Sequence, residues 1–76
     1  MKYNLRKELV MKMFKADITV TSEDGSIGAK VIYAASLGQV MDDAEYMVSA
    51  WIRESREIGN PIIKHKVIGG EAPEYV

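Results

Sequence analysis

Few side chains in this sequence could carry out acid–base or nucleophilic chemistry. His65 is the only histidine among the 76 residues, and the chain has no cysteine. A histidine acting as a general base needs a nucleophile or a carboxylate within reach, and no such partner can be assigned to His65 from the pattern. No glycine-rich phosphate loop follows a predicted strand, so no cofactor is expected. We expect a half-buried structural histidine and no enzyme activity; an enzyme that uses His65 with a carboxylate is a third hypothesis.

An acidic cluster is the first candidate binding site. Asp42 and Glu45 are three residues apart, so on a helix they lie on one side and could share a cation or face a basic partner. A metal ion would require more converging ligands than these, and we expect no metal site. Acids near a helix start are also stabilised by the helix dipole without any function. The predicted protein-binding surface consists of Asp42, Asp43, Glu45 and Tyr46.

Lysines on one face of the predicted sheet are the second candidate site. A basic surface of this kind could follow the phosphates of a nucleic acid. It lacks the interleaved aromatic side chains on which single-stranded bases stack, and lysines also protect sheets from aggregation. A solvated face is therefore favoured, with nucleic-acid binding as the alternative. This predicted face carries Lys15, Lys30, Lys64 and Lys66 around Asp17, Thr19 and Ile32.

Composition limits the remaining classes of function. The chain of 76 residues has a formal net charge of -1, which argues against strong nonspecific attraction to nucleic acid or to anionic membranes. No apolar run approaches a membrane span or a signal peptide, and the absence of cysteine fits a reducing compartment, so we expect a cytoplasmic protein. A domain this small is marginally stable alone. Homodimerisation, or coverage of apolar residues by the N-terminal arm, would add stability, and both alternatives stay open.

These candidate residues are positioned by one long amphipathic helix, predicted from Ser36 to Gly59. Ser36 and Gln39 have the spacing of a capping box at its start. Gly59 can adopt the left-handed conformation that ends a helix, and Pro61 prevents continuation. Apolar or small side chains recur every three or four residues and predict one buried stripe. The stripe comprises Leu37, Val40, Met41, Ala44, Met47, Val48, Trp51, Ile52, Ser55 and Ile58.

A β-hairpin is predicted before the helix. Residues 13–21 alternate between apolar and polar side chains, as a half-buried strand does. Asp24-Gly25 favours a two-residue type I′ turn. This turn would place Val20 opposite Ala29 and Ile18 opposite Val31, and a slip by one residue would move the apolar side chains to the other face.

A third strand is predicted from Ile62 to Ile68, ending at Gly69-Gly70. With its lysines outward, Ile63 and Val67 would join the core, with His65 between them or near its margin.

The predicted fold is a single α+β domain over residues 1–76, with the order β-β-α-β and one long helix packed on a three-stranded sheet. A right-handed crossover would make the third strand parallel to the second, beside the first. Residues 1–10 read as a short helix or a loose basic arm, and residues 71–76 as a flexible tail.

The run SLGQVMDDAEYMVSAWIRESREIGNPI resembles the helix of HicB-type antitoxin domains. The preceding Glu-Asp-Gly hairpin is similar too. The resemblance covers about half of the chain and implies a partial ribonuclease-H-like sheet that binds a small toxin, often with an added DNA-binding segment. For this chain the resemblance implies mainly a small binding module made of a sheet and a helix. The matching residues are Ser36, Leu37, Ala44, Trp51, Ile52, Gly59, Pro61 and Ile62.

The sequence therefore predicts a non-enzymatic regulator or inhibitor that acts by occupying the surface of a protein partner. Antitoxins and phage-encoded inhibitors of host defence, including anti-CRISPR proteins, are of this size, which is an analogy of scale. Nucleic-acid binding through the lysine face is the alternative function.

Overall fold

The computed structural model describes residues 12–72. They form β1 (Phe14–Ser22), β2 (Ile27–Ala34), α2 (Leu37–Glu57) and β3 (Ile62–Glu71). The helix or arm predicted for residues 1–10 lies outside the described residues, as do residues 73–76 of the predicted tail.

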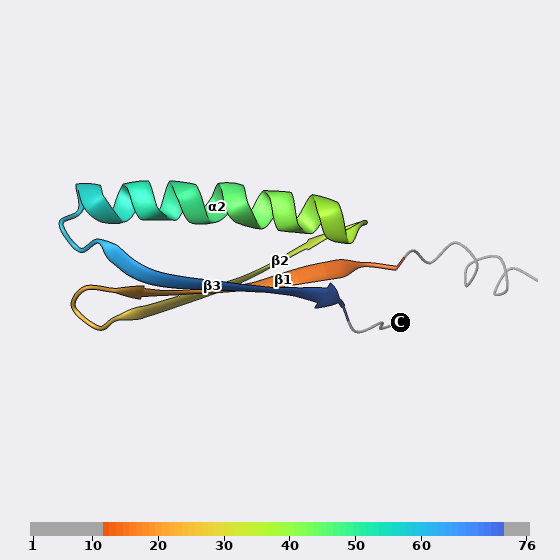
Figure 1. Cartoon of the computed structure of the whole chain (residues 1–76), viewed down its shortest axis with the longest axis horizontal. Helices are drawn as coiled ribbons and strands as arrows, with labels where there is room; N and C mark the ends of the chain where they lie inside the picture. The colour runs from red at the N-terminus through yellow and green to blue at the C-terminus, as the bar shows by residue number, and fades with distance from the viewer. Residues whose placement is uncertain (1–11, 73–76) are drawn as a thin grey trace, which may run out of the picture.

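The three strands form one sheet in the order β2-β1-β3. The central strand, β1, is antiparallel to both neighbours, so β3 runs parallel to β2. The helix α2 covers one face of this sheet and leaves the other face, called here the open sheet face, uncovered (Figure 1). The α+β class, the β-β-α-β order and the position of the third strand beside the first are confirmed.

The core lies between β1 and α2. Every second residue of β1 faces the helix, and α2 directs a stripe of small and β-branched side chains at this strand. Side chains from both flanking strands pack around the rim of the core. Within residues 12–72 the buried apolar residues are Ala16, Ile18, Val20, Val40, Ala44 and Val48.

Local hydrogen bonds fix both ends of α2 where the sequence predicts them. The Ser36 hydroxyl accepts from the Gln39 N–H at 3.1 Å, while the Gln39 side-chain amide donates to Asp43 at 3.0 Å instead of completing the capping box. At the other end Gly59 has a φ of 81°. The buried Ser55 hydroxyl donates to the Ile52 carbonyl at 2.7 Å and accepts from the N–H of Ile62, the first residue of β3, at 3.0 Å.

The turn between β1 and β2 contains three residues rather than the predicted two. The N–H of Gly25 donates to the Ser22 carbonyl and the N–H of Ser22 donates to the Ser26 carbonyl, both at 2.9 Å. Gly25 has a φ of 92°, whereas no non-glycine residue of the described chain has a positive φ. A type I′ turn needs positive φ at both central residues, and Asp24 does not provide it. The loop instead matches a type I turn followed by a left-handed glycine.

The extra loop residue shifts the hairpin register by one, so the predicted pairing is wrong. Val20 lies opposite Gly28, Ile18 opposite Lys30 and Ala16 opposite Ile32. Directly paired residues point to the same face of a sheet. Lys30 and Ile32 therefore face the helix and not the open sheet face on which they were predicted.

The third strand also departs from the prediction at both of its ends. A register shift between Thr21 and Ser22 makes Ile63 the extra residue of β3, so its side chain is 63% exposed and does not join the core as predicted. His65 and Val67 face the helix, opposite Val20 and Ile18. The strand then continues through both glycines to Glu71, and side chains of α2 pack over the first of them, Gly69.

Gly28 makes room for the only tryptophan of the chain. A Cβ atom at Gly28 would lie 2.7 Å from Cζ2 of Trp51, so the indole ring packs directly on the backbone of β2. The Lys30 ammonium lies 5.5 Å from the centre of the same ring, a distance at which a cation is attracted to the aromatic face.

The substitution Gly28→Ala is expected to lower the free energy of unfolding by about 1–3 kcal/mol, because the added methyl would displace the Trp51 ring. Gly70→Ala is the matched control, since a Cβ at this strand glycine would meet nothing within 4 Å. The free energy of unfolding of Gly70→Ala should stay the same or rise slightly, because alanine lowers the conformational entropy of the unfolded chain. Chemical denaturation of both variants, followed by Trp51 fluorescence, measures the difference. Equal destabilisation would contradict the packing described for Trp51.

The hairpin turn is also bonded to the loop that joins α2 to β3. The Glu23 N–H donates to the Pro61 carbonyl at 2.8 Å, and the Asp24 N–H donates to the Asn60 side-chain oxygen at 3.3 Å. The Asp24 carboxylate accepts from the Ser26 hydroxyl at 2.6 Å and from the Ser26 N–H at 2.8 Å. These bonds, the Ser26 hydroxyl first, lower the pKa of Asp24 below its ordinary value of 3.8.

A carboxyl group with a lowered pKa in the folded state stabilises the protein above its ordinary pKa, and this contribution is lost as the pH falls through the folded pKa. The difference in free energy of unfolding between the unmodified protein and Asp24→Ala should therefore be constant from neutral pH to about pH 5 and shrink below pH 4. Denaturation curves across this range measure it. A difference that does not change with pH would show that the carboxylate charge plays no part in the turn.

Candidate functional site

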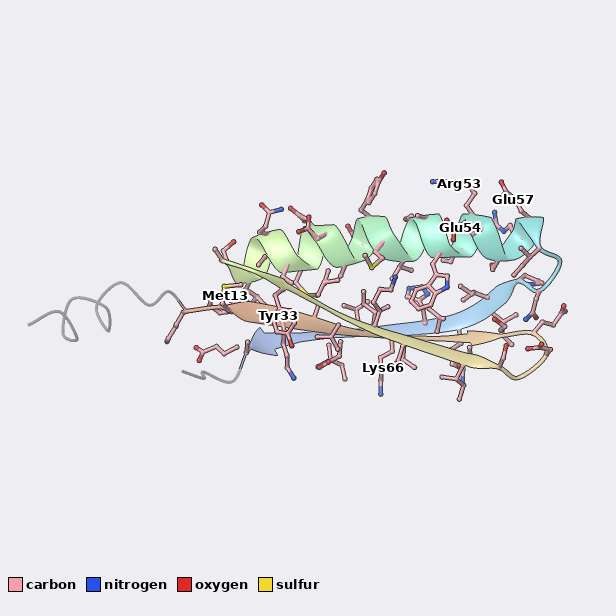
Figure 2. The ribbon with its side chains drawn as sticks, turned by 180° about the vertical axis from the view of Figure 1, so that it is seen from behind. Met13, Tyr33, Arg53, Glu54, Glu57 and Lys66 are labelled. Atoms are coloured by element: carbon pink, nitrogen blue, oxygen red, sulfur yellow. The ribbon has the colours of Figure 1, made fainter. Side chains whose placement is uncertain are left out.

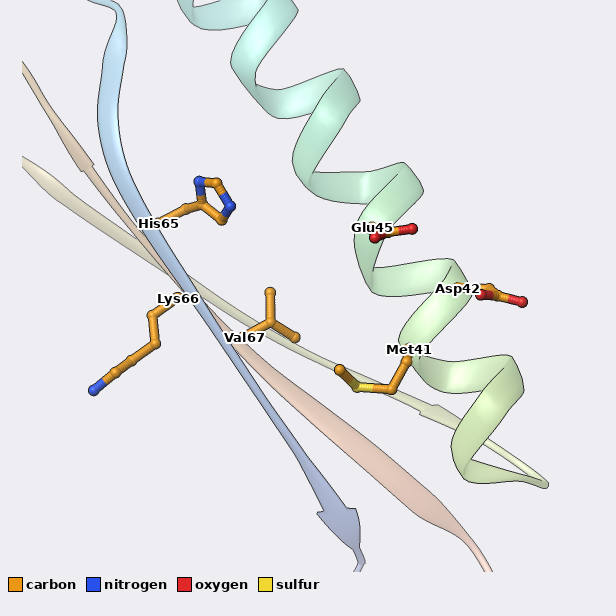
Figure 3. A pocket seen from close by; sticks show the side chains of 6 residues that line it. All are labelled: Met41, Asp42, Glu45, His65, Lys66 and Val67. Atoms are coloured by element: carbon orange, nitrogen blue, oxygen red, sulfur yellow. The ribbon is translucent and has the colours of Figure 1, made fainter.

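A groove of about 330 Å³ runs between the first half of α2 and the outer strand β3 (Figure 3). In Figure 3, His65 and Val67 project from β3 on the side of the helix, and Met41 projects from α2 towards the strand. The Lys66 side chain points away from the helix, so this residue contributes mainly its backbone. The residues that line the groove are Met41, Asp42, Glu45, His65, Lys66 and Val67.

The groove combines an apolar floor with acidic side chains on its helix side. Met41 and Val67 supply the apolar surface, while Asp42 and Glu45 supply two carboxylates. The ion pairs within residues 12–72 join Lys12 to Glu71 and Lys15 to Asp17, so neither groove carboxylate is neutralised by a described neighbour. An unpaired carboxylate beside apolar surface is suited to bind a long cationic side chain, whose methylene stem is apolar and whose head is charged.

The helix dipole does not account for these acids. The first turn of α2 contains no acidic residue, and Asp42 lies in the second turn. The favourable effect of the dipole on acids is confined to the first turn. The helix dipole therefore explains these two acids less well than their position near the start of the helix suggests.

The predicted acidic surface divides into two parts. Asp42 and Glu45 line the groove, whereas Asp43 bonds to Gln39 and does not. Tyr46 is 77% exposed and lies outside the groove. The sequence did not indicate that Met41 and Val67 would share a site with these acids, because Met41 belongs to the apolar stripe of the helix and Val67 to a distant strand.

The predicted lysine face is only partly assembled. Lys15, Lys64 and Lys66 belong to the open sheet face, but Lys30 lies on the helix side over Trp51. Lys15 is 3.5 Å from Asp17. Figure 2 shows Lys66 and Tyr33 on the side of the sheet away from α2.

Apolar side chains also share this open sheet face, and of these Val31 was predicted to face the helix. Val31 and Ile68 lie on either side of Asp17 in the sheet, and they are 45% and 53% exposed. Val31 lies there because the one-residue register shift turns the odd-numbered residues of β2 away from the helix, and Ile68 because it shares a side of β3 with Lys64 and Lys66.

Within residues 12–72, no three His, Cys, Asp or Glu side chains are arranged to hold a metal ion. His65 shares the groove with Asp42 and Glu45, so the third hypothesis, catalysis by His65 with a carboxylate, stays a prediction. No helix among these residues has the length and apolar character needed to cross a bilayer.

Neutralising the groove should not affect folding, because its carboxylates make no ion pair with described residues. The double variant Asp42→Asn/Glu45→Gln is expected to change the free energy of unfolding by less than about 0.5 kcal/mol. Ile18→Ala, which empties a fully buried position, should cost about 2–5 kcal/mol in the same denaturation assay. A loss of more than about 1 kcal/mol in the double variant would assign the two acids to the stability of the fold.

Comparison of the chain with protein-family models, with curated proteins and with solved structures finds no match. The resemblance of the residues from Ser36 to Ile62 to HicB-type antitoxin domains therefore remains a prediction.

Proposed function

We propose that this protein is a non-enzymatic, protein-binding regulator or inhibitor, which binds a basic surface of its partner through the first half of α2 and thereby occupies that surface. The observation that carries the proposal is the groove beside α2, whose lining combines Asp42 and Glu45, which form no ion pair with described residues, with the apolar Met41 and Val67. Asp43 and the exposed Tyr46 extend this surface over the helix. Acids and an exposed tyrosine together are suited to a polar interface with a positively charged protein.

A lysine or arginine side chain fits the groove because it has both an apolar stem and a positively charged end. Its stem would contact Met41 and Val67, and its charged end would reach Asp42 or Glu45. An ion pair of this kind contributes mainly to specificity and to the rate of association. The apolar contacts beneath it contribute affinity because they remove surface from water.

Nucleic-acid binding is less well supported than protein binding. With Lys30 on the helix side, the open sheet face has three of the four predicted lysines, and Lys15 lies close to Asp17. Tyr33 is the aromatic residue that β2 contributes to this face, whereas sheets that bind single strands usually stack several bases on aromatic rings.

An affinity pull-down of the full chain, with and without nuclease at moderate salt, separates the two functions. A stoichiometric protein that survives nuclease would support the proposal. Loss of every partner after nuclease treatment would contradict it and favour nucleic acid, whose binding should also weaken steeply with salt.

Charge reversal of the groove tests the proposed surface directly. Asp42→Lys/Glu45→Lys should lower affinity for a basic protein partner by about tenfold or more, because two attractive charges become repulsive. Glu54→Lys/Glu57→Lys is the matched control, with the same spacing and charge change on the same exposed helix (Figure 2). Titration calorimetry with the captured partner measures both. Equal losses in the two variants would mean that only net charge matters and that the groove is not the site.

A further inference from the structure

We propose that β3 accepts an extended segment of the partner as a fourth strand, with basic side chains of that segment directed into the groove beside α2. The proposal rests on the protein-binding function proposed above and adds the mode of binding and the kind of segment that is bound.

The hydrogen-bonding phase of β3 determines which of its backbone groups face outward. The Ala72 N–H donates to the Met13 carbonyl at 2.9 Å, and in an antiparallel pair the bonded positions alternate along the ladder. The even-numbered residues of β3 therefore bond to β1. The N–H and C=O groups of His65, Val67 and Gly69 point away from β1, and β3 has no strand on that side within residues 12–72.

The same residues direct their side chains toward the helix. His65 and Val67 line the groove, and Gly69 has Leu37 and Met41 above it, since a Cβ there would lie 2.5 Å from the Met41 sulfur. The free hydrogen-bonding groups and the groove thus lie along one stretch of β3. An added strand would bond to this stretch and direct every second side chain to the helix side, where Asp42 and Glu45 stand.

The opposite edge of the sheet is unsuited to strand addition. Lys30 lies in the middle of β2 and faces the helix side. A lysine in this position opposes pairing, because an added strand would cover its charge. The helix-facing residues of β3 from His65 to Gly69 include no lysine or arginine. Lys64 and Lys66 lie on the open sheet face, where their charges stay in water beside an added strand, so β3 is the more available edge.

Charge on the two sides of β3 defines the segment that fits. Asp42 and Glu45 favour basic residues on the helix side. Lys64 and Lys66 lie on the open sheet face. They disfavour basic residues at the intervening positions of the bound segment, whose side chains point to that face. The bound segment should therefore alternate basic residues with uncharged or acidic ones.

Synthetic ten-residue peptides test the proposal on the full-length protein. A peptide in which arginine alternates with threonine should bind, and its affinity should fall about tenfold or more in the Asp42→Lys/Glu45→Lys variant but not in Glu54→Lys/Glu57→Lys. The same peptide with glutamate in place of arginine should not bind. Absence of binding by both peptides would overturn the strand-addition proposal, while the pull-down judges the protein-binding function independently.

Backbone methylation distinguishes an added strand from a peptide held by charge alone. One peptide is N-methylated at its arginines and another at its threonines, so that composition and charge are equal. A strand directs alternate N–H groups to its neighbour, so one methylated peptide should bind about tenfold or more weakly than the other. The weaker one reveals whether the added strand is antiparallel or parallel. Equal binding by the two would overturn strand addition and leave the protein-binding function standing.

Amide hydrogen exchange locates the added strand. The N–H groups of His65, Val67 and Gly69 should exchange more slowly when the arginine peptide is bound, whereas those of Lys66 and Ile68, which are bonded to β1, should change little. Protection of His65 and Val67 in the protein alone would show that a second copy or another part of the chain already pairs with β3, and would overturn the proposal.

Discussion

Three alternate residues of β1 pack against three residues of α2 that lie four apart, and the rest of the molecule depends on this contact. Ala16, Ile18 and Val20 meet Val40, Ala44 and Val48, and these six are the buried apolar residues of the part of the chain that the structure describes. The flanking strands contribute side chains that are only partly buried. β2 and β3 are therefore held by hydrogen bonds to β1 and by the sides of the helix, which explains why a groove can exist between α2 and β3 without disturbing the core.

Local signals in the sequence were sufficient for the helix but not for the register of the sheet. Ser36 and Gly59 fix the ends of α2 through contacts within a few residues, so they can be read from sequence. Asp24-Gly25 is compatible with turns of two or three residues, and the bonds from Ser26 to the Asp24 carboxylate favour the longer turn. A difference of one residue there moves Lys30 and Ile32 to the opposite face, because side chains alternate along a strand.

The sequence predicted the acidic residues of the candidate site but not the groove that they line. Asp42 and Glu45 follow from helix spacing alone. The orientation of His65 and Val67 towards the helix follows from placing the lysines of β3 outward, but the bulge that makes Ile63 an extra, exposed residue was not predicted. Such a bulge arises from pairing with a strand more than forty residues earlier in the chain, and no pattern within β3 indicates it. The division of the acidic cluster, with Asp43 outside the groove, likewise follows from how the helix is rotated on the sheet.

The two ends of the groove differ in stiffness. Near the start of β3, the Ser55 hydroxyl joins α2 to Ile62, and the hairpin turn is bonded to Asn60 and Pro61, so helix and strand are fixed at this end by directional bonds. At the far end the contact is Met41 and Leu37 over Gly69. A methionine side chain has several soft torsions and no preferred partner. The Met41 side chain can therefore change its conformation over Gly69 while α2 and β3 stay in place, so that one groove can admit side chains of different size without repacking the core.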